Sequence, residues 1–166
     1  IFVPIFILAA ICCAVIFCET SEIHYTTSDN QKLVLDSYKF ENKILRHRYK
    51  DGKGVITFKG ELTYIPKEAF KFAPLTSITL PESVSSICKN AFHCSELESI
   101  YIPGSLAVIE AEAFLGCHKL RYIELPEGLK TIDSWAFQGC SSLNKITIPK
   151  NVEVIGVPKH CSAFGG

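Results

Sequence analysis

Cysteine and histidine are the side chains of this sequence best suited to metal binding, and three times they stand next to each other. The adjacent pairs are His93-Cys94, Cys117-His118 and His160-Cys161. Zinc sites usually take two close ligands from one loop, as in a Cys-x2-Cys motif, and the sequence contains no such motif. We therefore expect neither a metal ion nor another cofactor.

Motifs of catalytic sites are absent from the sequence as well. There is no Gly-x-Ser-x-Gly nucleophile motif, no His-Glu-x-x-His motif and no phosphate-binding Walker loop. Basic and acidic residues number 17 each, so the balanced charge gives no general attraction to nucleic acid. These features predict a protein that is not an enzyme and does not bind nucleic acid.

One basic segment could still bind an anionic ligand. Its members interleave with the aromatic Tyr49 and are Lys43, Arg46, His47, Arg48, Lys50 and Lys53. Clustered positive charge of this kind attracts phosphate or an acidic polysaccharide. The alternative is a solvated face of the domain that has no ligand.

The elements that position these residues recur every 22 or 23 residues. An Ala-Phe pair marks four copies, at residues 69–70, 91–92, 113–114 and 136–137. Short Ile-x-Ile or Ile-x-Leu segments end at Pro81, Pro103, Pro126 and Pro149, and a weaker first copy has Lys59 in place of Pro. A fixed step over most of a chain is typical of a solenoid.

Each repeat predicts one coil of that solenoid. The Ile-x-Ile/Leu segment alternates like a short strand, and Pro ends it because Pro cannot donate to a strand ladder. A Val/Leu-x-x-Ile segment then returns to the interior, and the Ala-Phe pair predicts a short helical turn with Phe in the core. Such coils bury their apolar side chains only by stacking, with strands about 4.8 Å apart in a parallel sheet.

Three cysteines, Cys94, Cys117 and Cys140, are spaced like members of one column in this stack. Equivalent residues of stacked coils point the same way, so their Cβ atoms lie about 4.8 Å apart, beyond the usual disulfide range. We expect buried free thiols that act as small apolar groups.

The full pattern, Leu-x-x-Ile-x-Leu/Ile-Pro-x-x-Val/Leu-x-x-Ile-x-x-x-Ala-Phe-x-x-Cys, resembles the BspA-like subclass of leucine-rich repeats. The resemblance covers about residues 55–156. It implies a β-rich, right-handed repeat solenoid with coils of 22–23 residues, a parallel sheet and short helical turns. It also implies a surface protein that adheres to host proteins or other microbes.

The flanking segments differ from the repeat. Residues 1–18, from Ile1 to Cys18, form an uncharged apolar run, which predicts a signal peptide or a membrane anchor and thus an extracellular or cell-surface location. Residues 19–54 predict an N-terminal cap of two or three strands that includes residues 33–40, with turns near residues 28–30 and 51–52. Residues 55–166 predict the solenoid, with about five coils and an atypical or truncated last one.

Outward-facing strand positions are the candidate binding residues. They form one row of Ser77, Ser99, Tyr122 and Lys145, and a second row of Thr57, Thr79, Tyr101, Glu124 and Thr147. Tyrosine suits a recognition surface because it combines a large rigid ring with a polar tip. The alternative is that Thr and Tyr occur here only because they favour strands.

These features together predict a surface or secreted module that binds other proteins or surface glycans through its strand face. One alternative is a structural spacer that holds a further domain away from the membrane, to which residues 1–18 would tether the chain. The other is an intracellular scaffold.

Overall fold

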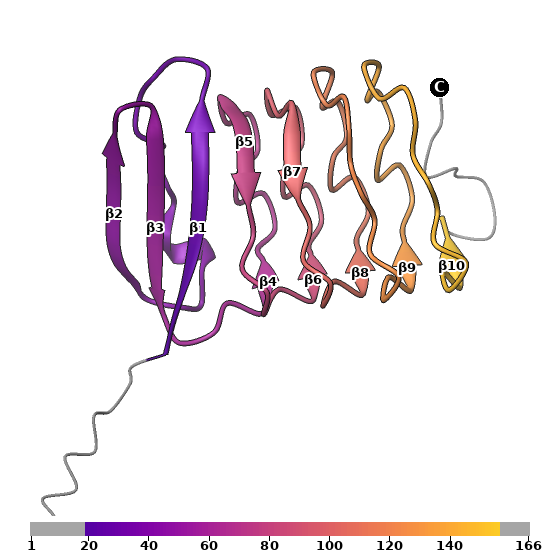
Figure 1. Cartoon of the computed structure of the whole chain (residues 1–166), viewed down its shortest axis with the longest axis horizontal. Coiled ribbons are helices and arrows are strands. Elements are labelled where there is room, and N and C mark those ends of the chain that lie inside the picture. The colour runs from indigo at the N-terminus through magenta and orange to yellow at the C-terminus, as the bar shows by residue number, and fades with distance from the viewer. Residues whose placement is uncertain (1–18, 157–166) are drawn as a thin grey trace, which may run out of the picture.

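The computed structural model describes residues 19–156, which fold into an antiparallel cap followed by a stack of coils (Figure 1). One sheet has the strand order β2-β3-β1-β5-β7. Its strands are β1 (Thr20–Thr27), β2 (Ile44–Lys50), β3 (Lys53–Lys59), β5 (Leu75–Thr79) and β7 (Ser99–Tyr101). The three cap strands pair antiparallel, whereas β5 and β7 pair parallel. Because β1 also pairs antiparallel with β5, it joins the cap to the coils.

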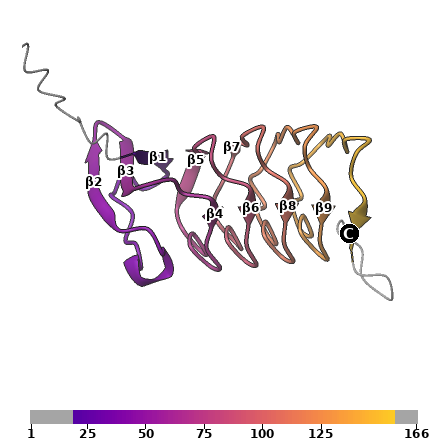
Figure 2. The same ribbon diagram turned by 90° about the horizontal axis from the view of Figure 1, so that it is seen from below.

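The second side of each coil contributes a two-residue strand to another sheet. In Figure 2 this sheet is seen as a row apart from β5 and β7. This sheet is parallel throughout and has the order β10-β9-β8-β6-β4. Its strands are β4 (Tyr64–Ile65), β6 (Ser86–Ile87), β8 (Val108–Ile109), β9 (Thr131–Ile132) and β10 (Val154–Ile155). The predicted repeat solenoid with parallel stacking is confirmed.

The Ala-Phe turns form the third side. Each turn closes by hydrogen bonds that reach three residues back, as from Ala91 N–H to the Cys88 carbonyl at 3.1 Å. Two residues per turn have left-handed backbone, one just before Ala and one two residues after Phe, so the turn cannot continue as a helix. The left-handed residues are Glu68, Phe72, Asn90, Cys94, Glu112, Gly116, Trp135 and Gly139.

A column of phenylalanine rings runs through the core. Phe70, Phe92 and Phe114 are at most 1% exposed, and successive rings from Phe70 to Phe137 stack with centroids 5.2–5.4 Å apart. In the cap, Phe40 lies 6.2 Å from Phe70 and so extends the column. The cap thereby covers the apolar end that a stack of coils would otherwise expose.

The thiol column differs from the prediction by one residue. Cys117 and Cys140 are buried free thiols, and each donates to the carbonyl of the Phe one coil earlier, at 3.1 and 3.2 Å. The third member is Ser95, whose Oγ lies 3.5 Å from the Cys117 Sγ, whereas Cys94 occupies the neighbouring left-handed position and is half-buried. The sequence register fails here because the cysteine stands one residue closer to Phe than in the other copies.

The cap also differs in part from its predicted strands. Residues 33–40 form no strand but an irregular segment with the 3-10 helix η1 (Ser37–Lys39), in which the Asp36 carboxylate accepts from Tyr38 N–H. The basic segment supplies β2 instead. The strand of the weaker first copy, with Ile56 and Phe58, lies on β3 and runs antiparallel to β1.

The inner side of β2 packs His47 and Tyr49 against Tyr25. The Tyr25 ring centroid lies 5.7 Å from that of His47 and 6.0 Å from that of Tyr49. The Tyr25 hydroxyl is 2.6 Å from His47 Nε2. Burial, assisted by the positive charge of Lys32, lowers the pKa of His47 to about 4. This histidine is therefore neutral in the folded cap at neutral pH.

Gly116→Ala is expected to lower the free energy of unfolding by more than the cost of placing alanine in left-handed backbone. Gly116 has φ of +71°, and an added Cβ would lie 2.7 Å from the Cys94 Sγ of the preceding coil. A left-handed alanine costs about 1–2 kcal/mol, and this contact adds to it. Urea unfolding should show that Cys94→Ala in the same chain relieves part of the loss.

The matched control is Gly104→Ala, because nothing lies within 4 Å of a Cβ there. Its free energy of unfolding should stay within about 0.5 kcal/mol of the parent. Strict additivity of Gly116→Ala and Cys94→Ala would contradict the contact.

His47 also predicts a pH dependence of stability. Its pKa is lowered from 6.5 to about 4 on folding. Between these two pH values the imidazole of the unfolded chain is protonated while that of the folded cap stays neutral, which favours unfolding. The stabilising contribution of His47 is complete above pH 6.5 and is lost as the pH falls towards about 4. The thermal midpoint of His47→Gln, measured across this window, should fall less steeply than that of the parent. The control is His118→Gln, at an exposed site, and equal slopes for both variants would refute the assignment.

Candidate functional site

The outward side chains of the first sheet form the surface that the repeat predicts for binding. Along β7, Ser99 and Tyr101 are exposed while Ile100 between them is buried. The alternation follows from strand geometry, which sends successive side chains to opposite sides of a sheet. We use the name strand face for this outward side together with residues 122–124 and 145–147.

Parallel stacking aligns the central residues of the two predicted rows. Ser77 lies opposite Ser99, and Thr79 lies opposite Tyr101, in the pairing of β5 with β7. A bridge between Ser99 and Tyr122 extends the first row by one coil. The structure therefore brings Tyr101 and Tyr122 onto neighbouring coils.

The far end of the strand face is a shallow hollow. Tyr122, Glu124, Lys145 and Thr147 line it, and its volume is about 300 Å³. Glu124 follows Tyr122 by two residues, so both side chains leave the chain on the same side. Four predicted residues from two successive coils thus share one depression.

Thr57 lies elsewhere on the same sheet. It stands opposite Glu22 of β1, and its Oγ1 donates to Glu22 Oε1 at 3.0 Å. Because β1 lies between β3 and β5, Thr57 is two strands away from Thr79. The repeat register, which places the two residues side by side, is wrong at this point because β1 inserts between them.

The hydroxyl groups of both tyrosines of the strand face donate hydrogen bonds to carboxylates. Tyr101 is 52% exposed and its hydroxyl donates to Glu82 Oε1 at 2.9 Å, while Tyr122 is 60% exposed and donates to Glu124 Oε2 at 3.2 Å. These hydrogen bonds and the negative charges raise the pKa of each phenol. Sequence reasoning missed Glu82, although its place directly after Pro81 is a repeat position.

A larger hollow of about 610 Å³ lies beside the two tyrosines. Gly104 lines it and occupies the position that carries Glu82 in the preceding coil and Glu127 in the following one. No atom lies within 4 Å of where a Cβ of Gly104 would stand. The missing side chain therefore leaves open space in the hollow, which Tyr101, Tyr122 and Glu127 also line.

The cap strands extend the strand face, which the sequence did not reveal. His24 of β1 lies opposite Thr79, and its Nε2 is 3.4 Å from Glu22 Oε2. Beyond β3, the exposed Arg46 and Arg48 of β2 complete the sheet. The alternation of residue types in Glu22-Ile23-His24-Tyr25 and Arg46-His47-Arg48-Tyr49 is the sequence signal that could have placed these residues outward.

The described residues supply little that could perform other chemistry. Within residues 19–156, no three His, Cys, Asp or Glu side chains are grouped to hold a metal ion. The hydrogen-bonded thiol of Cys117, together with burial, raises the pKa of Cys140, so Cys140 remains a thiol. The same part of the chain has no helix with the length and apolar character of a membrane span. Residues 1–18 and the pair His160-Cys161 lie outside the described residues.

Comparison with known proteins places these observations in a family. The family model of the BspA type leucine rich repeat region matches residues 49–161 in six copies. A crystal structure of a leucine-rich repeat protein from Bacteroides ovatus is 40% identical over 66% of this chain, with a TM-score of 0.55. The leucine-rich repeat protein of Treponema pallidum is 25% identical over 76% of this chain, with a TM-score of 0.59.

The matched regions are only part of these solved chains. They amount to 27% of the Bacteroides protein and 64% of the Treponema protein. No curated protein gives a significant match.

Proposed function

Because the chain belongs to the BspA-type leucine-rich repeat family, we propose that it binds another protein through its strand face, without catalysis. Repeats of this family generally serve as protein-interaction modules rather than enzymes. The strand face follows the first sheet from the cap strands to β7 and continues to the next coil through the bridge between Ser99 and Tyr122 (Figure 1). Such a surface suits a macromolecular partner better than an enclosed small molecule.

The observation that carries this proposal is the arrangement of Tyr101 and Tyr122 beside the hollow at Gly104. Both rings are more than half exposed, yet their hydroxyls are fixed by Glu82 and Glu124. Fixed rings lose little conformational entropy when a partner covers them, and aromatic anchors next to a recess are typical hot spots. A partner side chain that enters the hollow would contact both rings.

We further propose that the protein acts at the cell surface in adhesion. Families with this repeat are typically surface-associated in bacteria, and residues 1–18 have the composition of a signal peptide or anchor. Protease treatment of intact cells tests this location. Digestion of the tagged protein supports export, whereas resistance to protease on intact but not on lysed cells favours an intracellular scaffold.

The triple variant Tyr101→Ala, Tyr122→Ala and Glu124→Gln tests the strand face. Its binding to immobilised extracellular-matrix proteins and to whole bacterial cells should be about tenfold weaker or worse, because it removes the aromatic anchors. Gly104→Gln should weaken binding similarly because the new side chain fills the hollow. The fold should tolerate this change, because neighbouring coils already carry long side chains at the equivalent position.

The matched control exchanges Lys130 and Glu153 for Ser on the side of the second sheet. This pair is an exposed salt bridge of 3.0 Å, so its loss should change stability by about 1 kcal/mol or less and leave binding unchanged. Unchanged binding by a folded triple variant would contradict the role of the strand face. Absence of binding by the parent to every surface would favour a structural spacer.

The cap end of the strand face supports a second candidate, the binding of an acidic glycan. Arg46 and Arg48 are exposed, and within residues 19–156 neither has an ion-pair partner. Alternate residues of a strand lie about 6.8 Å apart on one side, so the two guanidinium groups form a short basic row. The competing explanation is that charges on an edge strand prevent pairing with other sheets.

Heparin chromatography distinguishes these explanations. If the row binds glycans, Arg46→Ser with Arg48→Ser should shift elution to lower salt, while Lys67→Ser, at an exposed site outside the strand face, should not. A parent chain that passes through the column at low salt would eliminate the glycan candidate.

A further inference from the structure

The hydrogen bonds between the Ala-Phe turns all have the same direction. The N–H groups of Phe70, Phe92 and Phe114 donate to the Ala carbonyls of the next coil, at 2.7, 2.8 and 2.8 Å. The same direction holds two residues later, as from Phe72 N–H to the His93 carbonyl at 2.9 Å. Every coil therefore points its turn carbonyls towards the cap.

This polarity leaves acceptors without donors at the first coil. Ala69 and Lys71 correspond to Ala91 and His93, whose carbonyls accept from the preceding coil. No coil precedes Ala69 and Lys71, and within residues 19–156 no group donates to either carbonyl. We call the row of hydrogen bonds between the Ala-Phe turns of successive coils the turn ladder. In the described part of the chain, the carbonyls of Ala69 and Lys71, two residues apart, are unpaired acceptors at its open edge on the first coil.

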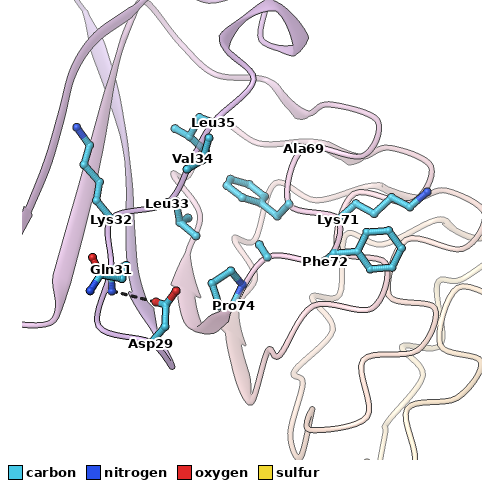
Figure 3. A pocket seen from close by; sticks show the side chains of 12 residues that line it. Asp29, Gln31, Lys32, Leu33, Val34, Leu35, Ala69, Lys71, Phe72 and Pro74 are labelled. Atoms are coloured by element: carbon cyan, nitrogen blue, oxygen red, sulfur yellow. Dashed lines mark hydrogen bonds between the residues drawn. The ribbon is translucent and has the colours of Figure 1, made fainter.

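A groove of about 350 Å³ lies along this edge, between residues 69–74 and the cap segment 29–35 (Figure 3). Its volume falls within the range of about 300–1,000 Å³ that is usual for ligand pockets. Two large apolar side chains of its lining are exposed, Val34 at 99% and Phe72 at 66%. The cap wall is anchored by the bond from Leu33 N–H to the Tyr25 hydroxyl at 3.3 Å.

We propose that this groove binds an extended peptide segment of a partner protein, which adds to the turn ladder. An extended peptide presents N–H groups on one edge at every second residue, which is the spacing of the Ala69 and Lys71 carbonyls. Apolar side chains of the peptide contact two separate points, the exposed Val34 on the cap wall and the exposed Phe72 at the opposite end, where its ring centroid lies 5.6 Å from that of His93 (Figure 3). The lining carries Lys32 and Lys71 together with Asp29, so formal charge does not select the ligand. The two carbonyls require N–H donors, whereas the exposed Val34 and Phe72 disfavour a sugar.

The groove is separate from the strand face. It lies on the turn side of the first coil and shares no lining residue with the hollows beside Tyr101 and Tyr122. Recognition of this kind resembles strand addition at a sheet edge, in which backbone bonds supply affinity and side-chain contacts supply specificity. The inference therefore stands independently of binding at the strand face.

Selection from a random heptapeptide phage library on the folded chain tests the proposal. Selected peptides, resynthesised and titrated by calorimetry, should bind Val34→Ser with Phe72→Ala at least tenfold more weakly than the parent. The matched control is Tyr38→Ala, which removes a 98% exposed aromatic ring of the cap outside the groove. This control and the triple variant at Tyr101, Tyr122 and Glu124 should bind the peptides like the parent.

Methylation of single peptide nitrogens tests the backbone bonds themselves. Methyl groups on alternate nitrogens should abolish binding, and those on the intervening nitrogens should be tolerated. Failure to select any peptide, insensitivity to the Val34 and Phe72 changes, or a methylation profile without alternation would overturn the proposal. So would self-association of the parent, seen by sedimentation and removed by Phe72→Ala, because a second copy would then be the occupant.

Discussion

Stacking of incomplete coils in strict register is the constraint on which the whole structure depends. No coil of 22 or 23 residues can enclose its own apolar side chains, so each is buried only by its neighbours. The phenylalanine column shows the result, with ring planes only 3–14° apart between successive coils from Phe70 to Phe137. The register that aligns the rings also aligns the parallel strands of both sheets and the hydrogen bonds between turns.

Two left-handed residues per turn follow from the same constraint. They orient alternate backbone groups along the stack, so that N–H groups face the next coil and carbonyls face the cap. The backbone strain of residues such as Glu68 and Trp135 is offset by these repeated hydrogen bonds. Polarity of these hydrogen bonds is thus a property of the whole stack, and within residues 19–156 it leaves the Ala69 and Lys71 carbonyls of the first coil without a donor.

Side chains repeat from coil to coil in the core but vary on the surface. Because inward positions are fixed by stacking, only outward ones can differ between coils without loss of stability. The position after the repeat proline illustrates this, since Gly104 between Glu82 and Glu127 opens a hollow without altering the backbone path. A surface of this kind can acquire a specific binding site through a few substitutions.

The repeat period by itself determined the fold class, the buried Phe positions, and the alignment of Ser77 with Ser99 and of Thr79 with Tyr101. These follow from local spacing, because stacked coils place equivalent residues side by side. Only the tertiary structure decided that β1 inserts between β3 and β5, which separates Thr57 from Thr79 and brings His24 and Glu22 onto the strand face. The pairing of strands distant in sequence and the groove beside the cap depend on three-dimensional contacts that no period encodes, whereas the place of Ser95 in the thiol column follows from its spacing to Phe92.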